Sequence, residues 1–394
     1  MGPMPSQARL DPRRVAVAAA GFSVFLNLYA AQSLLPTLVR ELRASPETAG
    51  WTVGGVTLAI ALSSPLAGVL VGRMRRRAVL GASFAGLLLA TLGCAASPDL
   101  PTLIACRFAQ GLCLPPVMAL TMSYIGEAWP ASEVGRVMAF YVSCNVVGGF
   151  LGRFLAGLAA AWSGWRSAFL ALAVLNALAG WAVLRAMPEG RPAAPGPGGE
   201  SGLAGHLRTP RMRVAFSAGF TVLFSLTALF TYVTYYLAAP PFHLGPAELG
   251  ALFAVYLVGV VITPLAGRRI RPGTYGRVLA TSSAVGAGGA LLTLVPSLPA
   301  VLAGLTVCSS SVFVSQSAAS GYVSETAGSD RSSALGLYLA FYYLGGSAGA
   351  TLPGLFWSRA GWSGTLALIL AVNLATMVLA RRLETAHEAA LPGL

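Results

Sequence analysis

The stretch LPTLIACRFAQGLCLPPVMALTMSYIG, residues 100–126, is apolar almost from end to end, yet it contains Arg107. A run of this length can cross a bilayer as one helix. An ionised guanidinium in hydrocarbon costs several kcal/mol, so a charged residue there is expected to face the inside of a helix bundle. The stretch therefore predicts a membrane-spanning helix with one polar face turned away from lipid.

The whole chain has the composition of a membrane protein. Apolar residues make up 56% of it and charged residues only 10%, whereas a soluble domain is about 25% charged. Apolar runs bounded by charge, proline or glycine lie at residues 15–39, 49–71, 78–97, 100–124, 134–161, 166–184, 212–238, 247–267, 275–295, 299–323, 332–356 and 363–380. These twelve runs predict an all-α membrane protein of twelve transmembrane helices.

Arginine carries every positive side-chain charge, because the chain has no lysine, and the net charge is +13. With the N-terminus placed inside, 20 of the 26 arginines fall in tails and loops on the cytoplasmic side. The positive-inside rule then places both termini in the cytoplasm, and we expect a multi-pass protein of a bacterial inner (cytoplasmic) membrane. No basic patch interleaved with aromatics lies on a soluble module, which argues against nucleic acid as a partner.

The two halves of the sequence match each other in register. Four pairs of segments match at offsets of 197–199 residues: 164–176 with 361–373, 63–68 with 262–267, 123–127 with 321–325, and 148–152 with 345–349. Such a duplication of six helices is typical of secondary transporters. The predicted parts are a cytoplasmic tail (1–14), a first six-helix half (15–186), a flexible cytoplasmic linker rich in proline and glycine (187–210), a second six-helix half (211–382) and a cytoplasmic tail (383–394).

Short motifs resemble those of the major facilitator superfamily, and with the duplication they extend the resemblance over essentially the whole chain. RFAQG (107–111) resembles the fourth-helix motif, GVLVGRMRRR (68–77) the loop between helices two and three, and VVGGFLGRFLAG (146–157) the antiporter motif of helix five. LYAAQSLLP (28–36) resembles a branch of bacterial arabinose-efflux-like permeases. The resemblance implies two pseudo-symmetric six-helix halves around a central cavity, in a twelve-helix branch similar to drug/proton antiporters.

Arg107 and Gln110 are the first candidates for that cavity. They are three residues apart, so they share a helix face, and the resemblance implies that the arginine takes part in substrate binding and coupling. The alternative is that Arg107 extends outward to the membrane surface. The matching position of the second half is Leu305, which carries no charge, and this asymmetry favours a functional role for the arginine.

Glycine and charged residues near the predicted cytoplasmic face are candidates for gating. Gly68 and Arg73 match the loop motif, although the family's aspartate is a glycine here. We expect Glu127 to pair with Arg73, and Glu325 to pair with Arg268 in the second half. The alternative is that these charges are solvated and only set the topology.

In helix five, Gly148 and Gly152 have the small-xxx-small spacing that lets helices approach closely. We expect helix five to pack tightly against the other half, and Arg153 is a further candidate for coupling. The family's proline is absent from this run.

Polar and aromatic residues on other predicted spans complete the candidate cavity. Their hydrogen-bonding groups would be penalised by lipid, so they are expected to face the interior. These candidates are Asn27, Tyr29 and Gln32 in helix one, Asn145 in helix five, Tyr232, Tyr235 and Tyr236 in helix seven, Gln316 in helix ten, and Tyr338 and Tyr342 in helix eleven. Helix packing or an interfacial aromatic belt is the alternative explanation.

Several chemical signals are absent from the sequence. No Asp or Glu lies in the middle of a predicted span and the three histidines lie in loops, so proton coupling is implied by the resemblance alone. The five cysteines lie in or beside apolar runs, without metal-ligand spacing. No nucleotide-binding, serine-hydrolase or zinc-protease motif is present. We therefore expect no enzyme activity, no cofactor and no metal.

The sequence favours a secondary active transporter that exports a small organic solute by alternating access, with proton antiport left open. The alternative is an uncoupled facilitator or importer of a sugar or organic anion, which the lack of mid-span carboxylates favours. A membrane receptor or lipid-modifying enzyme on the same scaffold is the third and weakest hypothesis. The expected partners are the lipid bilayer and a small-molecule substrate, and the expected state is a monomer.

Overall fold

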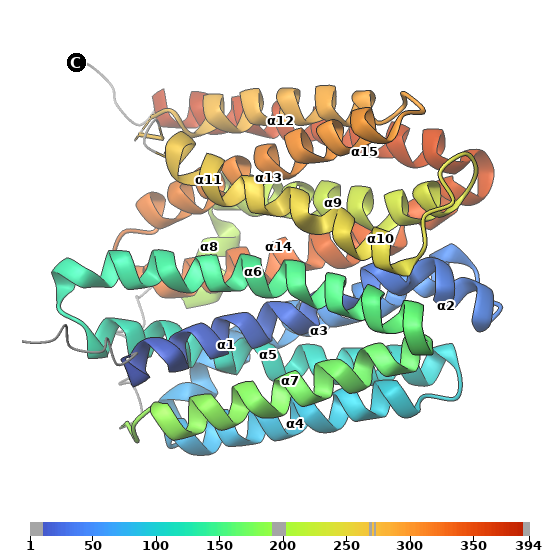
Figure 1. Cartoon of the computed structure of the whole chain (residues 1–394). Helices are drawn as coiled ribbons and strands as arrows, with labels where there is room; N and C mark the ends of the chain where they lie inside the picture. Colours follow the sequence, from blue (N-terminus) through green and yellow to red (C-terminus); the bar gives the residue numbers. More distant parts are fainter. Residues whose placement is uncertain (1–10, 191–201, 268–269, 272, 389–394) are drawn as a thin grey trace, which may run out of the picture.

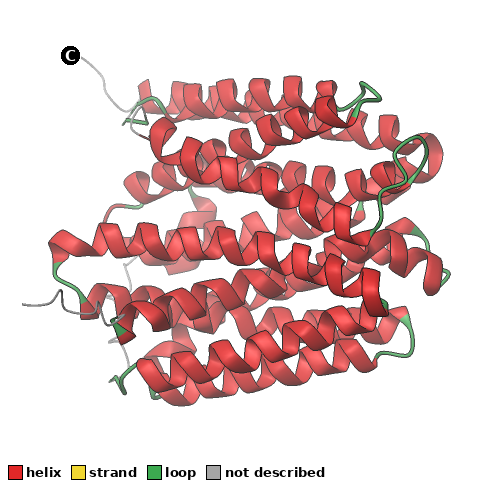
Figure 2. Cartoon of the chain, viewed as in Figure 1, coloured by secondary structure: helices red, strands yellow, loops and turns green. Residues whose placement is uncertain are grey.

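The computed structural model describes residues 11–190, 202–267, 270–271 and 273–388 (Figure 1). Every regular element in this part of the chain is a helix (Figure 2). The all-α class predicted from hydropathy is thus confirmed. Eight of the described helices are long and apolar enough to cross a membrane.

The helices follow the predicted apolar runs. The first group is α1 (Pro12–Leu28), the 3-10 turn η1 (Ala30–Leu34), α2 (Leu35–Glu41), α3 (Pro46–Arg73), α4 (Arg76–Ala96), α5 (Leu100–Ala128), α6 (Ala131–Ser163) and α7 (Trp165–Ala186). After the short helix α8 (Gly202–Arg208) come α9 (Pro210–Ala238), α10 (Pro246–Ala251), η2 (Leu252–Ala254), α11 (Val255–Gly267), α12 (Tyr275–Leu292), α13 (Leu298–Thr326), η3 (Gly328–Asp330), α14 (Arg331–Thr351) and α15 (Pro353–Glu388). Each of the twelve runs falls on one helix or on consecutive ones.

Local chemistry explains where these helices begin and end. The Asp99 carboxylate caps α5 by accepting from the backbone N–H of Thr102 at 2.9 Å, and its hydrogen bonds with Thr102 lower the pKa of Asp99. Gly164 ends α6 at φ 78°, and Gly361 sits at a kink inside α15 at φ 56°. Only glycine adopts these angles easily, and the two glycines are the matched Gly-Trp positions of the duplication.

The helices pack in two groups (Figure 1). Helices α1–α7 contact one another, α9–α15 contact one another, and the groups meet chiefly where α3 packs on α14 and α6 packs on α10. We call the end where α1 begins the near end, and the end where residues 42–45 join α2 to α3 the far end. The near end is on the left of Figure 1 and the far end on the right.

Glycines hold equivalent helices together in both groups. A side chain at Gly148 or Gly152 of α6 would overlap the carbonyl oxygen of Phe22 or Leu26 in α1. The matched glycines of α14, Gly345 and Gly349, meet the carbonyl oxygens of Phe220 and Phe224 in α9 in the same way. Gly148 and Gly152 therefore pack within the first group, while the predicted packing of this helix against the other half is made elsewhere along α6.

A different glycine of α6 makes the contact between the groups. A side chain at Gly157 would overlap the carbonyl oxygen of Pro246 at the start of α10, and it would lie 3.3 Å from the Cα atom of Gly250. Gly50 of α3 meets the carbonyl oxygen of Ala350 in α14 similarly. At the far end, the groups thus meet backbone to backbone.

Part of the predicted linker is ordered. Residues 191–201 lie outside the described residues, but Gly202–Arg208 form α8, which packs on α9 and α14. His206 of this helix is buried, and its Nε2 lies 2.9 Å from the Asp330 carboxylate. The expectation of a linker that is flexible throughout is thus corrected over α8.

Candidate functional site

Arg107 is fully buried inside the first group, and four oxygen atoms of that group accept hydrogen bonds from it. Its Nε donates to the Thr52 carbonyl at 2.9 Å, and its terminal nitrogens donate to the carbonyls of Asn27 and Leu28 at 2.8 and 2.9 Å. It also donates to Gln110 Oε1 at 2.6 Å. Because α1 ends at Leu28, the carbonyls of Asn27 and Leu28 have lost their helical partners. Arg107 supplies the missing donors.

A polar cluster continues from Gln110 towards α7. Gln110 donates to Thr91 Oγ1 at 2.7 Å, and Asn176 donates to the same oxygen at 3.2 Å. Asn27 donates to Asn176 Oδ1 at 2.7 Å. We call Asn27, Thr91, Arg107, Gln110 and Asn176 the polar knot. In this conformation, the knot residues predicted for the cavity, Asn27, Arg107 and Gln110, face protein, which corrects their predicted position.

Arg153 of α6 is the buried arginine that lies between the groups. Its Nε donates to Gln32 Oε1 at 2.8 Å and one terminal nitrogen donates to the Gly149 carbonyl at 2.6 Å. Its guanidinium carbon lies 4.7 Å from the ring centre of Tyr29, 4.5 Å from that of Phe253 and 5.0 Å from that of Tyr256. The first ring belongs to the first group and the other two to the second.

Gln32 continues this connection across the groups. It lies in η1, is 1% exposed, accepts from Arg153, and donates through Nε2 to Thr231 Oγ1 of α9 at 3.2 Å. Such a chain of hydrogen bonds fixes the position of the guanidinium between the two groups.

Buried tyrosines of α14 surround this point from the other side. Tyr342 is buried and packs against Tyr343 with ring centres 5.6 Å apart, and its hydroxyl lies within electrostatic range of those of Tyr29 and Tyr256. We define the junction site as Tyr29, Gln32, Arg153, Phe253, Tyr256 and Tyr342. It combines a cation with aromatic faces and hydroxyl groups, an arrangement suited to an anionic ligand with an apolar body.

The remaining cavity candidates lie elsewhere. Asn145, with its amide set by its hydrogen bonds, donates to the Gly21 and Tyr141 carbonyls, so it joins α6 to α1. Tyr338 is buried against Gly219 of α9. Tyr236 stacks on Trp362 at 5.3 Å, within the second group.

Two tyrosines of α9 lie at the contact between the groups. The Tyr232 hydroxyl donates to the Ala350 carbonyl at 3.2 Å, beside the contact of that residue with Gly50. The Tyr235 hydroxyl donates to the Pro46 carbonyl of α3 at 3.5 Å. Gln316 of α13 is half-buried, and the structure gives no contact of its side chain with the junction site. Tyr232 and Tyr235 therefore belong to the far-end closure and not to the junction site.

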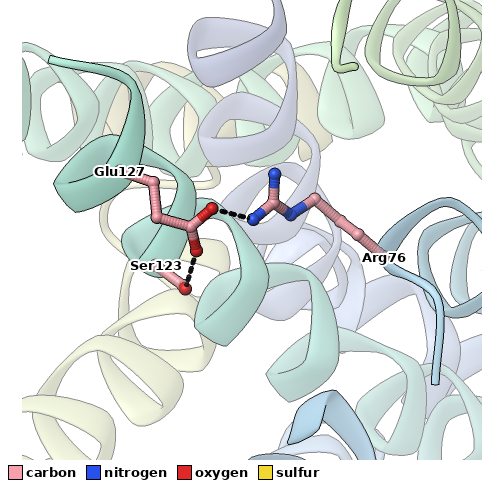
Figure 3. Close-up of polar contacts among 3 residues, drawn as sticks. All are labelled: Arg76, Ser123 and Glu127. Atoms are coloured by element: carbon pink, nitrogen blue, oxygen red, sulfur yellow. Dashed lines mark hydrogen bonds and ion pairs between the residues drawn. The ribbon is translucent and has the colours of Figure 1, made fainter. Parts of the chain in front are cut away.

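At the near end, the Glu127 carboxylate forms an ion pair with Arg76 and accepts from Ser123 Oγ at 2.7 Å (Figure 3). The partner predicted from sequence was Arg73. The side chain of Arg73, like Gly68 and the whole of Arg268, lies outside the described residues. At the matched position of the second half, the Glu325 carboxylate interacts with the Tyr275 hydroxyl.

Removing the charge of Glu127 is expected to weaken the near end modestly. Arg76 is 5% exposed but Glu127 is 45% exposed, so solvent screens the pair. We expect Glu127→Gln to lower the free energy of unfolding by about 1 kcal/mol, read as a lower midpoint of thermal unfolding in detergent. Ser123→Ala is the control, because it removes only a neutral donor. Equal midpoints for Glu127→Gln and the wild type would contradict the role of the pair.

A model of the Major Facilitator Superfamily matches residues 17–329 of the chain. The chain belongs to this superfamily. Its relatives in the major facilitator superfamily include YybF of Bacillus subtilis, an uncharacterized MFS-type transporter that is 32% identical over 356 residues, or 89% of this chain and 88% of that protein. The inner membrane transport protein YnfM of Escherichia coli is 30% identical over 377 residues, or 94% of this chain and 90% of that protein.

A solved superfamily structure has the same fold at low identity. The human organic anion transporter MFSD10 is 18% identical to this chain and superposes on it with a TM-score of 0.69. The match covers 94% of this chain and 100% of the MFSD10 chain. The chain is thus a multi-pass membrane protein of a transporter superfamily, and the resemblance read from its motifs is confirmed at this level.

Four residues that the fold brings into these clusters are not among the candidates predicted from the sequence. Phe253 and Tyr256 lie within an apolar helical run, where an aromatic residue carries no distinguishing signal. Thr231 directly precedes the candidate Tyr232 in a predicted span, but a threonine alone carries little signal there. Asn176 was noticed only as a repeat position matching Asn373, although a polar residue mid-span could have identified it.

Proposed function

We propose that this protein is a secondary active transporter that exports a small organic anion by alternating access, with Arg153 as the group that recognises the anionic part. The observation that carries the proposal is the position of Arg153. It is 4% exposed, lies between the two helix groups, and forms no ion pair with a carboxylate among the described residues.

The partners of Arg153 are neutral groups, which stabilise its charge less strongly than an anion would. A neutral amide, a carbonyl and three aromatic faces stabilise its charge in place of an anion. Two of those faces, Phe253 and Tyr256, belong to the second group. If the groups separate there, the guanidinium loses both faces, and a ligand anion can replace them at a gain in charge-assisted hydrogen bonding.

This exchange suggests how the cycle is coupled to the substrate. In the closed arrangement, the aromatic faces stabilise Arg153. In the open arrangement, the carboxylate or other anion of the substrate does so, and the ring of a substrate would pack on Tyr29 and Tyr342. A ligand shifts the balance between two conformations only by binding them differently, and Arg153 supplies such a difference.

The direction of transport and its coupling to protons are inferred from the sequence. The predicted topology makes the far end the outer face, so the backbone contacts at Gly157 and Gly50 would close the outward path. Export follows the resemblance of the first helix to efflux permeases. Proton antiport needs a site that changes protonation, and no mid-span carboxylate is present, so uncoupled transport of the anion is the second candidate.

The test is a panel of small aromatic carboxylates, each compared with its neutral amide, measured as the shift in thermal unfolding midpoint of the purified protein. We expect at least one carboxylate to stabilise the protein more than its amide. Arg153→Gln should lower the affinity for that carboxylate by at least about tenfold, and Arg153→Lys should lower it less.

Transport of the same carboxylate into inverted membrane vesicles then tests the direction. Equal stabilisation by a carboxylate and its amide, unaffected by Arg153→Gln, would refute recognition of the anion by Arg153. Carboxylate uptake that collapses with the proton gradient would favour antiport over uncoupled transport.

A further inference from the structure

A small cavity lies inside the second helix group, among α9, α12, α13 and α15. Its lining mixes apolar side chains with oxygen-bearing ones, which are Ser225, Ser282, Ser283, Ser311, Ser315, Asn373 and Thr376. Its volume of about 20 Å3 is enough for about one water-sized particle. No arginine, lysine or carboxylate lines it.

The cavity occupies the place that corresponds to the polar knot of the first group. The glycine contacts of α1 with α6 and of α9 with α14 fix the register at 197–198 residues. In that register Asn27 corresponds to Ser225, Gln110 to Cys308 and Asn176 to Asn373. All three of the second-group residues line the cavity. The shorter side chains of Ser225 and Cys308 thus leave a space where Asn27 and Gln110 fill the first group.

Several lining hydroxyls have already used their single hydrogen. Ser311 donates to the Val307 carbonyl at 2.8 Å. Ser282 donates to the Val278 carbonyl at 2.6 Å and accepts from Ser315, whose oxygen is 2.8 Å away. Thr376, also in the lining, donates to the Val372 carbonyl at 2.9 Å. A hydroxyl whose hydrogen is engaged offers only lone pairs to other groups. The lining is therefore rich in acceptors.

Two further lining groups have no partner among the described residues. Ser225 is 5% exposed and its hydroxyl has no hydrogen bond there. The half-buried Asn373 likewise has no side-chain hydrogen bond to the described part of the chain, whereas its counterpart Asn176 bonds to Asn27 and Thr91. An unsatisfied buried polar group is costly, so the Ser225 hydroxyl indicates a ligand, and Asn373 offers a second side-chain oxygen in the same lining.

We propose that this cavity binds one small monovalent cation, with Na⁺ coordinated by the oxygens of Ser225, Asn373 and the neighbouring hydroxyls. Hard cations take oxygen ligands, and the acceptor-rich lining provides them. Neutral oxygens without a carboxylate compensate a single charge better than a double one, which excludes Ca²⁺ and Mg²⁺ as the preferred ions. The site does not depend on the identity of the transported solute.

The experiment measures the thermal unfolding midpoint of the purified full-length protein in NaCl and in choline chloride of equal ionic strength. We expect the midpoint to rise with NaCl concentration and to saturate, because binding to the folded state alone stabilises it. Ser225→Ala and Asn373→Leu should each abolish this increment. Ser310→Ala is the matched control: Ser310 is buried in α13 without a hydrogen-bond partner among the described residues, but it does not line the cavity.

Two results would overturn the proposal. Equal midpoints in NaCl and choline chloride would mean that the cavity holds water. A sodium increment that survives in both Ser225→Ala and Asn373→Leu would place the ion elsewhere. If Ser225→Ala does not fold, Thr376→Val serves instead, because it removes a lining oxygen while nearly conserving shape.

Discussion

Replacing Arg107 with alanine is expected to destabilise the protein more than any other single change considered. The substitution leaves the carbonyls of Asn27 and Leu28 and the side-chain oxygen of Gln110 without a donor in a fully buried place. Each unsatisfied group costs about 1–3 kcal/mol, so we expect a loss of at least about 3 kcal/mol in the free energy of unfolding. The measurement is the thermal unfolding midpoint and the yield of monodisperse protein in detergent.

Arg107→Lys separates charge from geometry. A lysine keeps the positive charge, but its single ammonium cannot match the planar fork that joins α1, α3 and Gln110, so we expect an intermediate midpoint. If Arg107→Ala kept the wild-type midpoint and lost ligand binding, Arg107 would be a ligand group, as the sequence motif predicts, and its structural role would be refuted.

Gly157→Val is expected to slow transport strongly while leaving the fold intact. Its side chain would overlap the carbonyl of Pro246 only when the two groups are closed at the far end. Each 1.4 kcal/mol by which the closed state is disfavoured shifts the conformational equilibrium about tenfold, so we expect at least a tenfold fall in transport rate. Ser33 lies in η1 and is buried, with its hydroxyl donating to the Arg153 carbonyl at 2.8 Å. In a background without the native cysteines, Ser33→Cys combined with Gly157→Val should react faster with an impermeant maleimide applied from the far side.

Gly126→Val provides the control. Gly126 lies in a helix, and nothing lies within 4 Å of a side-chain carbon built there, so the intrinsic cost of valine is similar but no contact is disturbed. Wild-type transport and unchanged labelling in Gly157→Val would show that the contact of Gly157 with Pro246 is not part of the closure.

Hydropathy was sufficient to predict the helices, because lipid penalises polar groups along every span. The turn chemistry was also readable: Gly164 and Gly361 repeat because both turns need a positive φ. The hydrogen-bond partners of Arg107 could not be predicted from the sequence. An arginine and a glutamine at i and i+3 satisfy a cavity or a broken helix equally well, and neither proline nor glycine marks the break after Leu28.

The candidate site was predicted in part for a similar reason. Tyr29, Gln32 and Arg153 are polar groups in apolar runs, and this alone singled them out. Phe253 and Tyr256, which complete the ring of aromatic faces, look like ordinary apolar residues of a span. Which of the two arginines lies between the groups depends on how the halves are docked, and sequence periodicity does not encode that docking.

The backbone contact between the two groups at the far end has a consequence for the leakage of ions. There, Gly157 and Gly50 rest against carbonyl oxygens of the opposite group, and a backbone surface has no rotamers with which to adapt to a partial separation. Packed surfaces of this kind favour discrete arrangements over a continuous range. The closure should therefore act as an all-or-none valve, with half-open forms too short-lived to let ions slip through and dissipate the membrane potential.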